Sequence, residues 1–178
     1  MAPLIPQPLD GSSRARRIRW RVTEFIHREP VWMLYVRRLT ERRCRCYETQ
    51  SAGRGIWHPD CLGLGYELSL EKFPGRRVAR PTEERDIAVF GQMSQTHPII
   101  FMPYYMEPKE NDLVVEVLRW RGMRPVSVFR VYTVMIALPM SQSEVSFFAC
   151  GCNPYDLDKT RMLEAIEGMP IRLRTAER

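Results

Sequence analysis

Four potential metal ligands stand in two close pairs in the first half of the chain. One residue separates Cys44 from Cys46, two separate His58 from Cys61, and eleven lie between the pairs. A short turn directs both side chains of a pair toward one point, and sulfur with imidazole nitrogen is a donor set that Zn²⁺ prefers. Four protein ligands leave no open position for water, so the spacing predicts a structural zinc site formed by Cys44, Cys46, His58 and Cys61.

The first pair departs from the usual two-residue spacing, so other interpretations stay open. A Cys-x-Cys pair can chelate a metal, but its local geometry differs from that of Cys-x-x-Cys. The alternatives are free thiols beside a surface histidine, or a disulfide between Cys46 and Cys61. The N-terminal residues do not have the pattern of an export signal, which favours reduced cysteines. A second Cys-x-Cys, Cys150-Gly-Cys152, has no nearby partner ligand and is predicted to pack as small apolar side chains.

No recognisable catalytic motif occurs in the sequence, and the chain is expected not to be an enzyme. Its three histidines, His27, His58 and His97, stand outside any nucleophile–base pattern. Gly63-Leu-Gly65 lacks the third glycine of a dinucleotide-binding loop, and there is no phosphate-binding P-loop. Acidic clusters at 83–86 and 107–112 are interleaved with Arg, Lys and Pro, which is typical of solvated loops.

Positive charge is concentrated near the N-terminus. The 178 residues include 27 Lys and Arg against 21 Asp and Glu, a formal charge of +6. Eleven arginines and three glutamates lie between Arg14 and Arg45, which gives this segment +8 and leaves about −2 elsewhere. Guanidinium groups suit phosphate or carboxylate, so the segment is either a contact for DNA or an acidic partner, or a solvated basic face. The candidate contact residues are Arg14, Arg16, Arg17, Arg19 and Arg21.

The hydrophobic pattern predicts a mainly β chain with a helix near each end. Apolar residues recur at helical spacing over 13–28, and Pro30 ends that helix. A last helix is expected over 159–167, capped by Asp156 or Asp158 and followed by a tail. Between the helices, β-branched and aromatic residues gather in short segments separated by turn residues. These expected strands are 31–39, 87–90, 98–105, 113–120, 126–138 and 145–150.

Closely spaced strands without helical crossovers favour a small antiparallel β-barrel or sandwich. The expected fold adds an N-terminal helix, a zinc-ribbon-like insertion and a short C-terminal helix to that β domain. A chain of this length can bury a core without a disulfide scaffold, and no apolar run approaches the ~20 residues of a membrane span. The expected organisation is an extended arm (1–13), a basic helix and first strand (14–41), a Cys/His zinc-ribbon-like module (42–70), an antiparallel β domain (71–155), and a short helix and tail (156–178).

The order of these features resembles the small neck proteins of tailed bacteriophages, the head-to-tail connector or head-completion class. The likeness covers about residues 30 to 157, and two departures from the family are Cys44-Arg-Cys46 and His58 in place of a cysteine. The residues that carry it are the two ligand pairs, Gly53-Arg-Gly55, Gly63-Leu-Gly65-Tyr66, the segment 106–117 (MEPKENDLVVEV), Phe129-Arg-Val-Tyr-Thr-Val and Asn153-Pro-Tyr155.

The resemblance implies a structural protein of the virion neck, made in the host cytoplasm. Such a protein forms a homo-oligomeric ring between the portal and the tail, contacts portal or adjacent neck and tail proteins, and helps to retain or pass packaged double-stranded DNA. Exposed strand edges would suit this assembly, and neither a membrane nor a small-molecule substrate is expected. The alternative is a cellular zinc-ribbon module that binds nucleic acid, with the Arg-rich helix as its phosphate contact.

Overall fold

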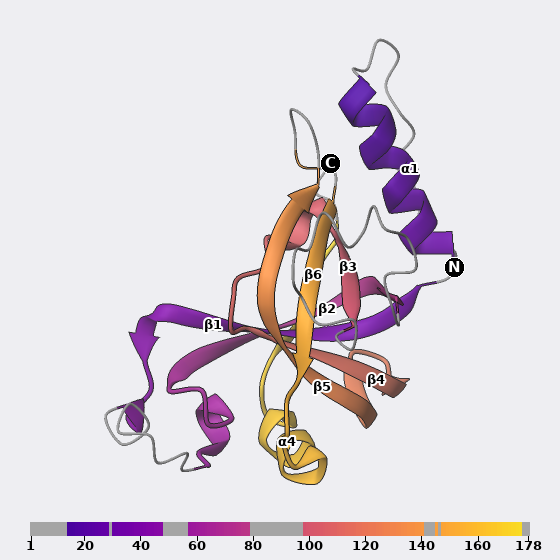
Figure 1. The fold of residues 1–178 in the computed structure, drawn as a ribbon. Coiled ribbons are helices and arrows are strands. Elements are labelled where there is room, and N and C mark those ends of the chain that lie inside the picture. Colours follow the sequence, from indigo (N-terminus) through magenta and orange to yellow (C-terminus); the bar gives the residue numbers. More distant parts are fainter. Residues whose placement is uncertain are drawn as a thin grey trace.

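The computed structural model describes residues 14–28, 30–47, 57–78, 98–140, 145 and 147–175. The expected arm over 1–13, the expected strand over 87–90, and His97 lie outside these residues. Two α-helices, two 3₁₀ turns and seven strands make up the described part (Figure 1). In chain order they are α1 (Arg14–Arg28), β1 (Val31–Arg43), η1 (Pro59–Cys61), β2 (Tyr66–Val78), β3 (Ile99–Pro103), η2 (Tyr104–Met106), β4 (Leu113–Arg121), β5 (Arg124–Met140), β6 (Phe147–Pro154), α4 (Lys159–Ile166) and β7 (Ile171–Leu173).

The seven strands form one sheet that returns to its own first strand. Neighbours follow the order β1-β4-β5-β6-β3-β2, and β2 pairs with β1 again, so six strands make a ring. All of these pairs are antiparallel, whereas β7 adds to β2 in parallel. Figure 1 shows α1 and α4 at opposite ends of this sheet. The expected mainly β class, with a helix near each end, is therefore confirmed.

Two strands, β2 and β7, are not predicted by the sequence pattern. β2 contains Pro74 and Gly75, which normally indicate a turn, yet both lie in the ladder with β1. A Cβ at Gly75 would lie 2.9 Å from the sulfur of Met33, so any larger residue there would force buried side chains to shift. Residues 171–173 were expected in the tail but form β7, where Ile171 pairs with Leu70 of β2. A three-residue strand is too short to produce a recognisable alternation.

Closure of the ring removes some of the free strand edges that the sequence led us to expect. Each of the six ring strands has a neighbour on both sides for at least part of its length. Among the described strands only β7 has a single neighbour. Free edges remain where a strand extends beyond its neighbour: β1 pairs with β4 only from Met33 to Val36, and β5 pairs with β6 only from Tyr132 onward.

Two apolar cores lie on opposite faces of the strands. Met33 and Tyr35 of β1 belong to one cluster, and the alternating residues Leu34 and Val36 belong to the other. The first cluster draws residues from all six ring strands and so fills the interior of the ring. The second joins β1, β2, β4 and β5 to η1 and α4. Both faces of β1 are therefore buried from Met33 to Val36.

The second Cys-x-Cys pair belongs to the interior core. Cys150 and Cys152 are free thiols with no exposed surface, packed among apolar side chains of the ring. Burial raises the pKa of Cys152 to about 12 and that of Cys150 well above its usual value. Both thiols stay neutral, so their predicted role as small apolar residues is confirmed.

The expected C-terminal helix is capped by Asp158. Its carboxylate accepts hydrogen bonds from the backbone N–H groups of Thr160 (3.0 Å) and Arg161 (3.1 Å). We expect Asp158→Ala to lower the free energy of unfolding by about 1 kcal/mol, because two N–H groups lose their acceptor. Urea unfolding followed by circular dichroism measures this. Asp156→Ala, an exposed neighbour, is the control and should change the value by less than about 0.5 kcal/mol.

No helix in the described part of the chain is both long enough and apolar enough to cross a membrane.

Candidate metal centre

The four predicted ligands meet at the far end of the β1–β2 ladder. Cys44 and Cys46 follow the last residue of β1. His58 precedes the 3₁₀ turn η1, and Cys61 is the last residue of that turn, which precedes β2. One ligand atom from each residue can be chosen so that all four lie within 4.8 Å of one another. Pairing of β1 with β2 brings the two halves together, and the predicted cluster is close enough to hold a metal ion.

The distances fit a tetrahedral site after small side-chain shifts. Zinc bonds of about 2.3 Å to sulfur and about 2.0 Å to nitrogen put two sulfurs about 3.8 Å apart, and sulfur about 3.5 Å from nitrogen. The Sγ of Cys44 lies 3.5 Å from Nδ1 of His58, and the Sγ atoms of Cys46 and Cys61 lie 3.2 Å apart. The latter distance is far longer than a disulfide bond of about 2.05 Å. Both cysteines are free thiols, in contrast to the disulfide alternative.

A tight turn shapes the second ligand pair. The carbonyl of His58 accepts from the N–H of Cys61 at 3.3 Å, and the carbonyl of Cys61 accepts from the N–H of Leu64 at 2.8 Å. Gly63 and Gly65 have φ values of 80° and 79°, in the left-handed region that a side chain disfavours. Gly63-Leu-Gly65, which does not match a dinucleotide-binding loop, therefore turns the chain next to the second ligand pair.

The turn is also tied to the first ligand pair. The N–H of Cys44 donates to the carbonyl of Gly65 at 2.9 Å. Next to it, the rings of Tyr47 and Tyr66 meet edge to face at 5.2 Å, and the guanidinium group of Arg43 lies 4.5 Å above the Tyr47 ring. Tyr66 directly follows the Gly-x-Gly, but nothing in the sequence identified Tyr47 as its partner. These contacts hold the end of β1 against the start of β2.

The backbone around Cys61 favours its ionised form. Burial alone would raise the pKa of this thiol, but hydrogen bonds from the Cys46 thiol and from the backbone of Gly65 and Gly63 outweigh burial and lower it. Burial and the hydrogen bond to Cys61 raise the pKa of Cys46 to about 12. Negative charge therefore develops first on Cys61, and a bound cation would draw protons from the other thiols.

The cluster is docked on the main body of the protein. Leu62, next to Cys61, has no exposed surface and packs in the second core with Met162 and Ile166 of α4. Trp57 and Leu64 pack against the same core. The described residues of this segment therefore share the core beneath α4.

The predicted basic contact residues lie on α1. This helix packs against β2, β3 and β6, with Ile26 and Thr23 buried. Arg17 and Arg21 are exposed. The side chains of Arg14, Arg16 and Arg19 lie outside the described residues.

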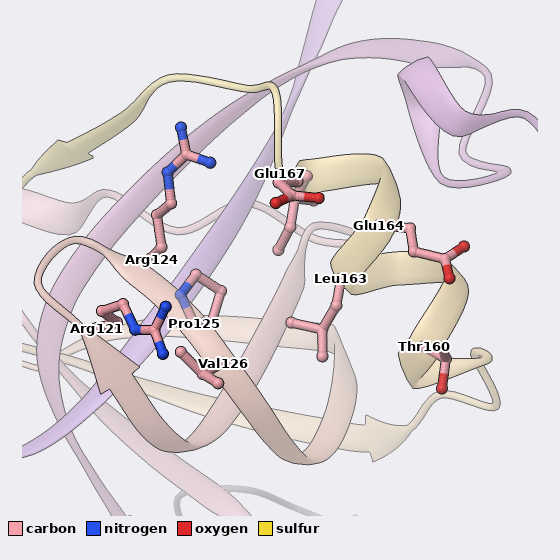
Figure 2. Close-up of a pocket in the computed structure, with 9 residues that line it drawn as sticks. Arg121, Arg124, Pro125, Val126, Thr160, Leu163, Glu164 and Glu167 are labelled. Carbon is pink, nitrogen blue, oxygen red and sulfur yellow. The ribbon is translucent and has the colours of Figure 1, made fainter.

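A cavity of about 330 Å³ separates the β4–β5 turn from α4 (Figure 2). Arg121 and Arg124 project from the hairpin side, and Glu164 and Glu167 project from α4. Its formal charges cancel, and its lining residues include neither histidine nor cysteine. No sequence pattern indicated this cavity, because its two walls lie far apart in the chain.

Comparisons with models of known protein families, with curated proteins and with solved structures gave no match.

Proposed function

We propose that the chain is a structural zinc protein of the neck of a tailed bacteriophage, forming a ring between the portal and the tail. The observation that carries the proposal is the clustering of Cys44, Cys46, His58 and Cys61 at the point where the resemblance to neck proteins requires a metal-bound module. In this proposal the closed six-stranded ring is a small antiparallel β-barrel, and residues 42–70 are a zinc-ribbon-like insertion.

Zinc is the metal that this donor set favours. Three thiolates and an imidazole suit Zn²⁺, and four protein ligands leave no position for a reacting water. When bound, the metal would hold the ends of β1 and β2 together. The role of the site is therefore structural.

Exposed apolar side chains support contact between copies of the chain. Leu118 on β4 is 66% exposed, Met135 on β5 is 46% exposed, and Phe129 on the same strand is 36% exposed. Such side chains can be covered by a neighbouring subunit. Side-chain contacts of this kind, together with the edges left free on β1 and β5, would join the subunits. A closed ring uses two different surfaces of each subunit.

Charge supports contact with DNA or with an acidic neighbour in the neck. Arg17 and Arg21 stand exposed on α1, which is far from the metal cluster in Figure 1. Arginines that contact phosphate groups bind DNA of any base sequence. A channel for packaged DNA needs this kind of contact, because every part of the genome passes through it.

The proposal predicts a discrete ring. We expect the zinc-loaded protein to give a single oligomer of cyclic symmetry by native mass spectrometry and electron microscopy. Leu118→Lys should shift it toward the monomer without changing its circular dichroism, since a buried contact would gain a charge. In particles of the phage that encodes the chain, an antibody against it should label the head–tail junction. A monomer that binds short DNA and is missing from particles would contradict the proposal and favour a cellular nucleic-acid-binding module.

A further inference from the structure

A second cavity, of about 430 Å³, lies where β1, β2 and β7 meet the loop that follows η2. Its wall consists of residues 37–42 of β1, Ser69 of β2, Lys109 of the loop and Arg172 of β7. The strand pairing brings these residues together. Arg37 of β1 is opposite Ser69 of β2, and Arg172 of β7 is opposite Glu71, which lies two residues after Ser69 on β2. We call this space the cationic cavity.

Cations outnumber carboxylates around the cationic cavity. Glu41 is the only acidic residue of its lining. Behind the wall, Glu71 faces two guanidinium groups at once, Arg37 at 3.2 Å and Arg174 at 3.5 Å. One carboxylate cannot neutralise both. The cations of the lining are Arg37, Arg38, Arg42, Lys109 and Arg172.

Two of these cations are available to an external anion. Lys109 and Arg172 are exposed, and neither side chain has a hydrogen bond or ion pair to another residue in the described ranges. Arg37, by contrast, is fixed: it donates to Glu71 and to the backbone carbonyls of Met106 and Glu107. Arg37 therefore adds fixed positive charge beside Lys109 and Arg172, whose donors remain free for an anion.

The remaining lining groups suit phosphate better than a peptide. Thr40 and Ser69 offer hydroxyl donors, and Leu39 is the only apolar side chain of the lining. A protein partner would need apolar or aromatic anchoring contacts, which this wall does not provide. Guanidinium and hydroxyl donors are the groups that contact nucleic-acid phosphates.

We propose that the cationic cavity binds phosphate groups of a nucleic-acid backbone. This inference deepens the DNA contact of the proposed function by giving it a site away from α1. It does not depend on ring formation. The cavity of Figure 2 provides the contrast, because Glu164 and Glu167 balance its two arginines.

The test compares two double variants with the same change of charge. Lys109→Gln/Arg172→Gln removes the two unpaired cations, and Arg121→Gln/Arg124→Gln removes two from the cavity of Figure 2. Binding of a fluorescent 20-base-pair duplex to the full-length zinc-loaded protein is followed by anisotropy over a salt series. We expect the first variant to bind at least about fivefold more weakly and to lower the slope of log K against log salt by about 1 to 2. The control should stay within about twofold of the unmodified protein.

Equal weakening in both variants would overturn the proposal, because it would show a response to net charge alone. No DNA binding by the unmodified protein, or loss of binding only in Arg17→Gln/Arg21→Gln, would overturn it as well. Binding of poly-glutamate but not of DNA would indicate an acidic protein partner instead. Circular dichroism and zinc content verify that each variant is folded. The ring and particle experiments are independent, so the proposed function and the phosphate site can fail separately.

Discussion

Replacing Cys61 by serine is expected to abolish stoichiometric zinc binding by the purified protein. Its thiol has the lowered pKa of the cluster and lies 3.2 Å from the thiol of Cys46. A serine hydroxyl is a poor zinc ligand, and removing one ligand of four forfeits much of a binding free energy of roughly 10–16 kcal/mol. Metal analysis by mass spectrometry should give about one zinc per unmodified chain and close to none per variant chain.

Cys46→Ser should give the same result, because the two thiols occupy one site. Cys152→Ala is the matched control: it also removes a free cysteine, but from the interior of the ring. This control should retain one zinc per chain while losing stability. Full zinc content in both Cys46→Ser and Cys61→Ser would show that the metal site is wrongly assigned.

Asp112→Ala is expected to lower the free energy of unfolding by roughly 3–5 kcal/mol. The carboxylate is 1% exposed, accepts a hydrogen bond from the Tyr35 hydroxyl at 2.6 Å and another from the N–H of Arg38 at 3.0 Å. The guanidinium group of Arg38 lies 3.5 Å away. Removing the acid leaves a buried hydroxyl donor, a backbone donor and a mostly buried cation without their acceptor. Urea unfolding measures the loss.

Two further variants isolate the cause. Glu110→Ala removes an exposed acid from the same loop and keeps the backbone carbonyl that accepts from Arg38, so its effect should stay within about 0.5 kcal/mol. Tyr35→Phe combined with Asp112→Ala should cost less than the sum of the single changes, since both remove one hydrogen bond. Strict additivity would contradict this coupling. A loss below about 1 kcal/mol for Asp112→Ala would show that the network contributes little to stability.

Local patterns were sufficient for the helices, most strands and the metal ligands. Clusters of β-branched and aromatic residues predicted β4 and β5, a cap at Asp156 or Asp158 predicted the start of α4, and ligand spacing identified the four residues that the structure brings together. Each of these signals lies within a few residues of the feature that it predicts. For that reason the sequence alone could reveal them.

Features that depend on long-range pairing could not be predicted. β7 is a strand only because β2 provides its partner, and Pro74-Gly75 reads as a turn until the ladder with β1 is known. The contact between Tyr35 and Asp112 spans 77 positions of the chain. The cationic cavity likewise combines three strands and a loop, whereas the sequence indicated only a basic N-terminal segment.

The packing of Leu62 beneath α4 makes the ligand turn and the C-terminal helix one cooperative unit. Cys61 and Leu62 are adjacent, and Leu62 shares its core with Met162 and Ile166. Withdrawing the metal would therefore relax the backbone that supports part of this helix. Backbone amides of residues 159–166 should then exchange faster when the metal is removed from the Cys/His cluster, although none of these residues is a metal ligand. A chelator would act on the C-terminal part of the protein through apolar packing alone.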